Sequence, residues 1–331
     1  MSRVVILTRG RSARGAGGAY DAPERRASGC VNTRRHGGHR QMIPADQALD
    51  MAAFGRSPIG SPLSMSKPIN PIAPYIGGKR NLAKRLCRII DAHDHRTYAE
   101  PFVGMGGVFL RRTNRARAEF INDRNREVYN LFRILQEHYV AFLDLLRFQI
   151  TTQAGFQRLL ALDPESLTDL QRAARFLFLQ RVAFGGKVTG QTFGVSADRR
   201  SRFDLTRLEP DLEALHERLS GVTVMCLDYA EFIDRVDRPS ALFYLAPPYF
   251  GCEADYGKDA FGRDDFGRIA AQLRGLKGAF VLSINDVPDI RELFAWAEIR
   301  PVVTTYSMAQ SNAKQAGELI ITNFDADMEM P

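Results

Sequence analysis

The sequence predicts an α/β fold built on a mostly parallel sheet with helices on both faces. Three observations support this class. Apolar runs of strand-forming residues alternate with segments of helical period over much of the chain. Two of these runs end in turns rich in glycine or proline, and polar and aromatic residues gather there. A long segment of helical pattern, residues 135–221, interrupts the alternation and indicates an inserted unit.

Positive charge is concentrated in the first 64 residues. The 331 residues carry a formal charge of +7, and residues 1–64 contribute +6 through ten arginines against four acids, so subtraction leaves +1 for the rest. This leader is rich in Arg and Gly and has no sustained hydrophobic period, so we expect it to be disordered. It is either a basic arm that contacts phosphates or, as the appearance of lysine only after Met65 favours, not part of the native protein.

The four cysteines are widely spaced, with no C-x-x-C pair and no histidine cluster beside them. This pattern argues against a zinc site or a disulfide framework and favours a reducing cytoplasm. No apolar run approaches the roughly 20 residues of a membrane span, and the apolar start is too short for a signal peptide. We therefore expect a cytoplasmic protein with no metal and no membrane partner.

A glycine turn and a lysine precede the first predicted helix. Tyr75 and Gly77-Gly78-Lys79 are followed by residues 81–90, whose apolar positions recur with a helical period. A lysine at a helix start meets the positive end of the helix dipole. Lys79 is therefore expected to serve something other than the helix, the alternative being an ordinary solvated surface lysine.

Residues 97–110 are predicted to form a strand, a second glycine turn and a helix. The glycine pattern alone could also be an ordinary tight turn. Gly104 and Gly106 in this turn let the backbone pass close to a ligand. A helix is expected directly after the turn, with unpaired N–H groups at its start.

A second strand, residues 118–122, ends at Asp123, about twenty residues after the glycines. An acid in that place can hold ribose hydroxyls. It can also cap the helix predicted over residues 126–136. Because the glycine turn precedes it, the ligand is favoured.

The inserted unit contains a basic and aromatic stretch. Arg181 and Lys187 lie in this stretch, and a polar loop leads on to Arg199 and Arg200. Such a unit suits contacts to phosphates and to base edges. The alternative is a solvated loop on a helical subdomain.

The sheet resumes after the insert with further strands, a helix and an antiparallel hairpin around a polar loop. The predicted strands cover residues 222–227, 241–245 and 279–286, the helix covers residues 261–276, and the hairpin strands cover residues 302–306 and 318–322.

The strand at residues 241–245 ends in Ala246-Pro247-Pro248-Tyr249, the feature around which the chain is organised. Prolines cannot donate to a sheet ladder, so the strand stops there and its carboxyl end opens into a loop. Ligands of open α/β sheets bind at that edge. Tyr249 adds an aromatic face. The stretch alone indicates a strand followed by a proline-rich turn, and the companion motifs are what favour a ligand site here.

With these motifs in this order, residues 70–324 resemble the DNA adenine methylase (Dam) family of N6-adenine-specific methyltransferases. The resemblance implies a Rossmann-like, S-adenosylmethionine-dependent methyltransferase fold with an inserted, mainly helical target-recognition domain. It implies S-adenosyl-L-methionine (SAM) as cofactor and site-specific methylation of adenine in double-stranded DNA, with base flipping. A restriction-modification or phage setting and a monomeric protein are also expected.

The resemblance also assigns domains and site residues. It implies a SAM-binding catalytic domain over residues 66–134 and 222–325 and a DNA target-recognition insert over residues 135–221. Catalysis maps to Ala246, Pro247, Pro248 and Tyr249, cofactor binding to Tyr75, Lys79, Pro101, Phe102, Gly104, Gly106, Asp123, Asp228, Tyr229 and Ala246, and DNA binding to Arg181, Lys187, Arg199 and Arg200.

One position departs from the family pattern, because the chain has Ala246 where the D-P-P-Y motif has its acid. In the family, this carboxylate and a backbone carbonyl accept hydrogen bonds from the N6 amine and stabilise the positive charge that develops on it. The resemblance therefore implies a scaffold whose activity is impaired or silenced. Three alternatives remain: an inactive relative that binds SAM and DNA, a substitute acid such as Glu253 or Asp255, and, less favoured because of the insert, a methyltransferase of RNA or protein.

Overall fold

The computed structural model describes residues 66–194, 198, 200–253, 261–307 and 313–326, with side chains left out at 304–307 and 313–316. All of them belong to one compact unit. The predictions made for the leader, residues 1–64, lie outside the described residues. Within the described part, no helix has the length and apolar character that a membrane crossing requires.

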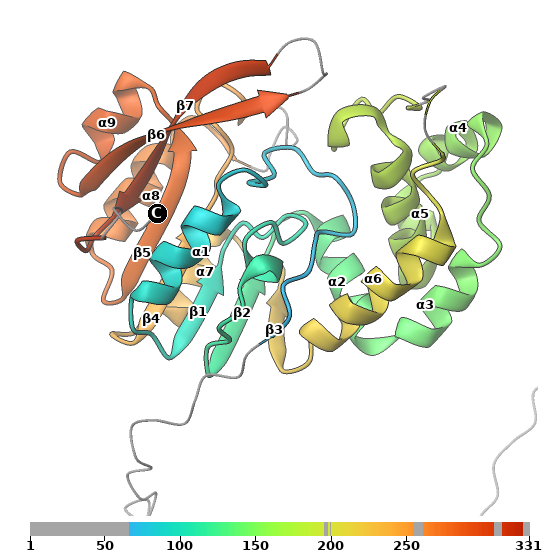
Figure 1. Cartoon of the computed structure of the whole chain (residues 1–331), viewed down its shortest axis with the longest axis horizontal. Coiled ribbons are helices and arrows are strands. Elements are labelled where there is room, and N and C mark those ends of the chain that lie inside the picture. The colour runs from blue at the N-terminus through green and yellow to red at the C-terminus, as the bar shows by residue number, and fades with distance from the viewer. Residues whose placement is uncertain (1–65, 195–197, 199, 254–260, 308–312, 327–331) are drawn as a thin grey trace, which may run out of the picture. The chain divides into compact units, whose positions relative to one another are not determined.

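The described strands form one seven-stranded sheet in the order β3-β2-β1-β4-β5-β7-β6 (Figure 1). Neighbours among β1 to β5 run parallel, whereas β7 is antiparallel to both β5 and β6. The predicted Rossmann-like α/β fold and its terminal hairpin are thus confirmed. The strands are β1 (Thr97–Glu100), β2 (Ala118–Asn122), β3 (Val222–Met225), β4 (Ala241–Leu245), β5 (Ala279–Asn285), β6 (Glu298–Ser307) and β7 (Ala313–Thr322).

Helices cover both faces of this sheet. Leu86 of α1 and Leu131 of α2 pack into one core, while Phe232 of α7, Phe266 of α8 and Ile290 of α9 pack into the other. The sequence did not predict α7 and α9, which are short. The helices are α1 (Ala83–Ala92), α2 (Arg126–Glu137), α3 (Tyr139–Leu146), α4 (Gln153–Ala161), α5 (Asp169–Val182), α6 (Leu205–Arg218), α7 (Tyr229–Val236), α8 (Asp265–Arg274) and α9 (Pro288–Leu293), with 3-10 turns η1 (Phe109–Arg111), η2 (Pro164–Ser166) and η3 (Phe184–Gly186).

Strand β4 is central because both of its faces are buried. Leu242 and Tyr244 point into the core that contains α1, while Phe243 and Leu245 point into the core that contains α8. A strand covered on both sides is apolar throughout and does not alternate with polar residues. Burial of each large apolar side chain contributes roughly 1.5–3 kcal/mol, so β4 is a rigid support for the residues that follow it.

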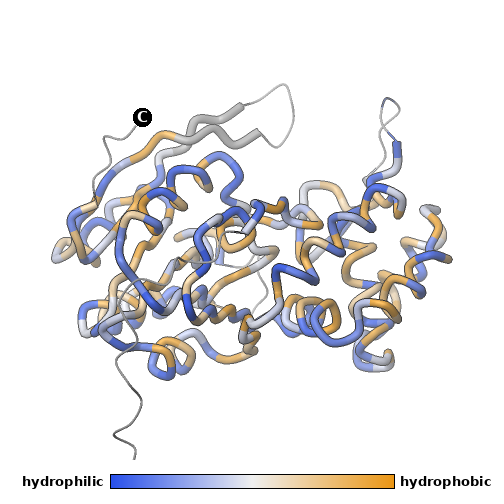
Figure 2. Tube along the Cα trace, turned by 60° about the horizontal axis from the view of Figure 1, so that its bottom comes forward, coloured by the Kyte–Doolittle hydropathy of each residue, from blue (hydrophilic) through white to orange (hydrophobic). Residues whose placement is uncertain are grey.

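Helices α3 to α6 lie together beside the β3 edge of the sheet, as Figure 1 shows. The helical character predicted for residues 135–221 is therefore confirmed. Thr168 and Gln171 form a capping box that starts α5, and α5 packs against α2, α3 and α4. Hydrophobic and hydrophilic stretches alternate along these helices in Figure 2, as expected for helices that bury one side.

The helix predicted directly after the glycine turn does not form, and only the 3-10 turn η1 is present. Gly104 and Gly106 have positive φ values of 49° and 72°, which keep the turn itself out of a helix. The chain is extended again at Arg112, whose guanidinium pairs with Asp91 and Glu119. Too few residues remain between these points for a full helix.

Candidate functional site

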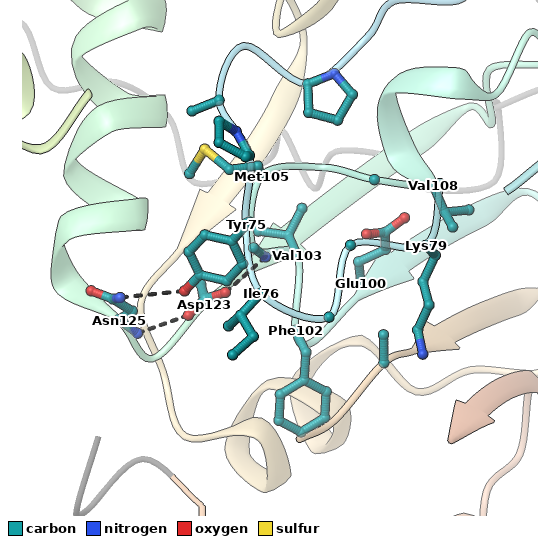
Figure 3. Close-up of a pocket in the computed structure, with 18 of the residues that line it drawn as sticks. Tyr75, Ile76, Lys79, Glu100, Phe102, Val103, Met105, Val108, Asp123 and Asn125 are labelled. Atoms are coloured by element: carbon teal, nitrogen blue, oxygen red, sulfur yellow. Dashed lines mark hydrogen bonds between the residues drawn. The ribbon is translucent and has the colours of Figure 1, made fainter. Parts of the chain in front are cut away.

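A cavity of about 840 Å³ opens at the carboxyl ends of β1, β2 and β4 (Figure 3). Its size lies within the roughly 300–1,000 Å³ that is usual for small-ligand sites. Segments far apart in the chain form its walls. They include residues 70–80, the turn after β1, residues 122–125 at the end of β2, the end of β4, and five residues of the insert, namely Arg181, Ser201, Arg202, Asp204 and Arg207.

The glycine turn after β1 lies directly against Tyr75. A Cβ atom added at Gly104 would come within 3.0 Å of the Tyr75 ring, and one added at Gly106 would come within 2.8 Å of Leu110. Both glycines are therefore needed for close packing as well as for their positive φ. Gly104 lines the cavity together with Tyr75 and Phe102.

Asp123 reaches from the end of β2 to the glycine turn. Its Oδ2 accepts a hydrogen bond from Gly104 N at 2.8 Å, and its Oδ1 accepts one from Asn125 N at 2.9 Å (Figure 3). Asn125, not Asp123, caps α2, because its side chain accepts from Glu127 N. The alternative that Asp123 is the helix cap is therefore wrong. Burial raises the pKa of Asp123 to about 6, against the two backbone hydrogen bonds, which lower it.

Lys79 is a buried cation, with only 5% of its surface exposed. Its Nζ forms an ion pair with Glu318 of β7 and donates to the Tyr249 hydroxyl at 3.0 Å. It also lies 4.4 Å from the centroid of the Tyr249 ring. Lys79 thus serves something other than the helix, and the alternative of a solvated lysine is wrong. Glu318 was not predicted from the sequence. The sequence feature that could have indicated it is an acidic residue within an otherwise apolar strand.

The end of β4 is held by neighbouring side chains. Ala246 and Pro248 line the cavity, and Pro247 is buried behind them. Just beyond Tyr249, Phe250 exchanges two hydrogen bonds with Asn285 of β5, at 2.9 and 3.0 Å. This two-point contact, also missed from the sequence, fixes the loop after the prolines.

Neither proposed substitute for an acid at position 246 gains support from the described structure. Glu253 accepts from Gly251 N and lies 3.3 Å from the Arg263 guanidinium, and it is not among the residues that line the cavity. Asp255 lies outside the described residues. The cavity therefore has Ala246 at the family's acid position and no carboxylate from Glu253.

Aromatic rings form the wall of the cavity beside α7. Phe102 lies 5.5 Å from Tyr229 and 5.8 Å from Phe261 between ring centroids, and all three rings line the cavity. Asp228 is instead the N-cap of α7 and pairs with Arg124 at 3.2 Å. Of the predicted acid–aromatic pair, the described cavity lining includes only the aromatic member.

The insert is tied to the cavity through the end of α5. The buried side chain of Gln180 donates to Pro74 O at 2.8 Å and to Gly186 O at 2.7 Å. Gly186 O also accepts from Ile76 N at 3.1 Å. Gln180, which is not among the predicted site residues, therefore joins the turn that follows α5 to the segment that carries Tyr75.

Arg181 connects the insert to the segment before Tyr75. Its guanidinium donates to the carbonyl oxygens of Ile72 and Arg202, and burial lowers its pKa. The other predicted DNA-binding residues differ: Lys187 and Arg200 are exposed, and Arg199 lies outside the described residues.

Glu100 is a buried carboxyl group that lines the cavity. It accepts a hydrogen bond from the Tyr98 hydroxyl at 2.5 Å, and burial raises its pKa to about 8. Among the described residues, no group of three or more His, Cys, Asp or Glu side chains is arranged to hold a metal ion.

Comparison with known proteins identifies a matching family and several relatives. The sequence profile of the D12 class N6 adenine-specific DNA methyltransferases matches residues 75–308. The Lactococcus lactis subsp. cremoris protein named type II methyltransferase M1.LlaDCHI is 24% identical over 278 residues, which cover 77% of this chain and 96% of that protein. The DNA N-6-adenine-methyltransferase of Escherichia phage P1 is 30% identical over 241 residues, 67% of this chain but only 31% of that longer protein. The Salmonella typhi DNA adenine methylase is 26% identical over 260 residues, covering 73% and 88% of the two chains.

The pKa of Glu100 predicts how stability changes with pH. An unfolded glutamate ionises near pH 4.5, whereas Glu100 in the folded chain keeps its proton up to about pH 8. Between these values the folded state binds more protons, so the free energy of unfolding falls as the pH rises. Glu100→Gln should remove this loss, so the variant should gain stability relative to the wild type by several degrees between about pH 5 and about pH 8. Thermal unfolding followed by circular dichroism tests this, and a difference that stays constant with pH contradicts it.

Proposed function

The chain belongs to the D12 class of N6 adenine-specific DNA methyltransferases, and on this premise we propose that it binds SAM and duplex DNA as a methyltransferase scaffold impaired at the transfer step by Ala246. One observation carries the proposal. A single cavity joins the Asp123 turn, suited to the cofactor, to the proline-rich end of β4, suited to the target base. The names of the relatives from Lactococcus and phage P1 favour a restriction-modification or phage setting.

The residues present fit SAM. Each Asp123 oxygen accepts one backbone N–H group, which leaves further lone pairs for two ribose hydroxyls. Gly104 has no side chain to fill the space beside Tyr75, and Phe102 and Tyr229 offer apolar ring surface. When bound, the cofactor supplies an electrophilic methyl group. Pro101 and Lys79 also line the cavity, whereas Gly106 would act through the shape of the glycine turn and Asp228 through its place at the start of α7, outside the lining.

The end of β4 would receive an adenine turned out of the duplex. Tyr249 offers a ring for stacking, and Pro247 and Pro248 fix the direction of the backbone carbonyls that accept from the amine. Ala246 keeps its carbonyl but lacks the carboxylate that would accept the second N–H and stabilise positive charge on the nitrogen. Loss of one such group costs about 10²–10³ in rate. No metal takes part in this step.

A second candidate function is a non-catalytic protein that binds SAM and DNA. Ala246 favours this non-catalytic function, because the cavity keeps a surface for binding but lacks the acid that would stabilise positive charge during transfer. The two candidates differ only in whether an acid at position 246 restores transfer. RNA and protein substrates are disfavoured by the helical insert between β2 and β3.

We assign DNA recognition to residues 135–221 and the catalytic domain to residues 66–134 and 222–325. Within the insert, exposed Lys187 and Arg200 suit phosphate contacts. Arg181 would act by holding the insert against the cavity. The hydrogen bonds from Gln180 to Pro74 and Gly186 would couple a movement of the insert to the segment that carries Tyr75.

The proposed function is tested by restoring the acid. Ala246→Asp should raise adenine N6-methylation of duplex DNA by about 10²-fold or more, because a carboxylate then faces the amine. The measurement is transfer of a tritiated methyl group from SAM to DNA, followed by nucleoside analysis. Tyr249→Ala in the restored protein should lower the rate again, since base stacking of roughly 1–3 kcal/mol is lost. An Asp variant that binds SAM but methylates no DNA supports the non-catalytic candidate, and label on cytosine contradicts the base assignment.

Cofactor binding is tested separately at Asp123. Asp123→Asn replaces one accepting oxygen with a donor, and loss of one charged hydrogen bond of roughly 1.5–3 kcal/mol should weaken SAM binding by about tenfold or more. In the wild type the affinity should also fall as the pH drops below about 6, where the carboxylate gains its proton, whereas the Asn variant should lack this dependence. Titration calorimetry measures both. Absence of SAM binding to the wild type at millimolar concentration contradicts the assignment.

The DNA-binding role of the insert is tested at Lys187. Lys187→Ala should weaken binding to duplex DNA and reduce the slope of log affinity against log salt by about 1, the effect of one lost phosphate contact. Lys277→Ala is the matched control, because Lys277 is also exposed but lies just before β5, at the amino ends of the parallel strands and away from the cavity lining. Fluorescence anisotropy over a salt series measures both variants. Equal losses for the two would show general electrostatic attraction without a binding surface on the insert.

A further inference from the structure

Lys79 and Glu318 form a buried pair from opposite ends of the fold. They are 239 residues apart in the sequence and are 5% and 1% exposed. Lys79 lines the cavity, whereas Glu318 does not. The ion pair with Lys79 therefore connects Glu318 to the cavity wall. Lys79 in turn contacts Tyr249, with its Nζ 3.0 Å from the hydroxyl and 4.4 Å from the ring centroid.

The position of Glu318 is fixed by the sheet. In the register of β7 it pairs with Asn285 of β5 on one side and with Val302 of β6 on the other. Alternation along the strand places it on the same face as Ile320, which belongs to the core that contains α1. The carboxylate thus sits on a rigid strand, while Lys79 precedes α1 and Tyr249 follows β4.

We propose that Glu318 is a positioning residue of this site: it keeps the ammonium of Lys79 charged and in place, and Lys79 fixes the ring and hydroxyl of Tyr249. The inference rests on the proposed function, in which Tyr249 is the ring that receives the target base. A lysine offers donors only, so Lys79 cannot replace the acceptor that Ala246 lacks. Its part is to hold the ring that lies three residues after Ala246.

Opposing effects act on the charge of Lys79. Burial lowers its pKa, while the charge of Glu318 and the hydrogen bond between them raise it. The other titratable groups lining this part of the cavity are Glu100 and Tyr244, whose pKa values are both raised by burial. Arg80 and Arg111 also line it and add positive charge. Glu318 is the acid that favours the charged form of Lys79.

The first test is Glu318→Gln in the ligand-free protein, with thermal unfolding measured from about pH 6 to about pH 10. The change leaves a buried ammonium without its counter-charge, so the melting temperature should fall by roughly 6–20 °C at neutral pH. The pKa of Lys79 should then fall further below that of an unfolded lysine. Because the unfolded state binds more protons between those two pKa values, the difference in melting temperature between the variant and the wild type should shrink as the pH rises.

Glu119→Gln is the matched control. Glu119 of β2 is 3% exposed and pairs with Arg218, Arg112 and Arg115, away from the cavity lining. Arginine keeps its proton throughout this range, so the loss in the control should not recover with pH. Adding Lys79→Met to the Glu318→Gln variant should also restore part of its stability, because the uncompensated charge is removed. A loss in Glu318→Gln that neither recovers with pH nor responds to Lys79→Met overturns the proposal.

The second test concerns Tyr249 directly. The ring resonance of Tyr249 in ¹³C-tyrosine-labelled protein, assigned with Tyr249→Phe, should shift in Glu318→Gln and stay in place in Glu119→Gln. An unchanged resonance in Glu318→Gln overturns the positioning role, even if the charge pair is confirmed. Both tests use the chain without ligand, so their outcome is independent of whether the protein with Asp at position 246 methylates DNA.

Discussion

The buried pair between Lys79 and Glu318 is the interaction on which the carboxyl edge of this fold depends. Two ions removed from water lose several kcal/mol of hydration each, so such a pair persists only with good geometry and further hydrogen bonds. The Tyr249 hydroxyl supplies one of them. The pair therefore joins three parts of the chain that no local rule connects, namely the segment before α1, the loop after β4 and the strand β7.

The strand order explains why a cavity opens at this edge. From β1 the sheet continues to β2 and β3 on one side and to β4 and β5 on the other. Ligands of open α/β sheets bind at such a reversal of strand order. The Asp123 turn lies on the β2 side and Ala246 on the β4 side, and the glycine turn after β1 lies between them. The proposed cofactor site and the proposed site for the target base thus lie side by side because β1 pairs with both β2 and β4.

The sequence predicted the structure correctly where local rules determine it. The apolar run before Pro247 gave strand β4 with its observed bounds, and the glycine turn and β2 were found in the same way. The prediction of a helix after the glycines was wrong. The turn of positive φ ends only a few residues before the buried Arg112, where the chain is extended again, so a full helix does not fit between them. Glu318 was missed because its partner is set by tertiary contacts. Lys79 at a helix start and Glu318 in an apolar strand were each locally unfavourable, and two such charges of opposite sign are a usable signal for a long-range pair.

The same pair explains how this site keeps its shape with Ala246 at the acid position. If Lys79 had depended on a carboxylate at 246, alanine there would leave a buried, uncompensated ammonium, which costs roughly 3–5 kcal/mol. Here Glu318 provides the counter-charge from a different strand. Asn285 holds the loop that follows the prolines through its two hydrogen bonds with Phe250. The contacts that hold this edge of the sheet therefore come from Glu318 and Asn285, and none of these contacts requires a carboxylate at position 246.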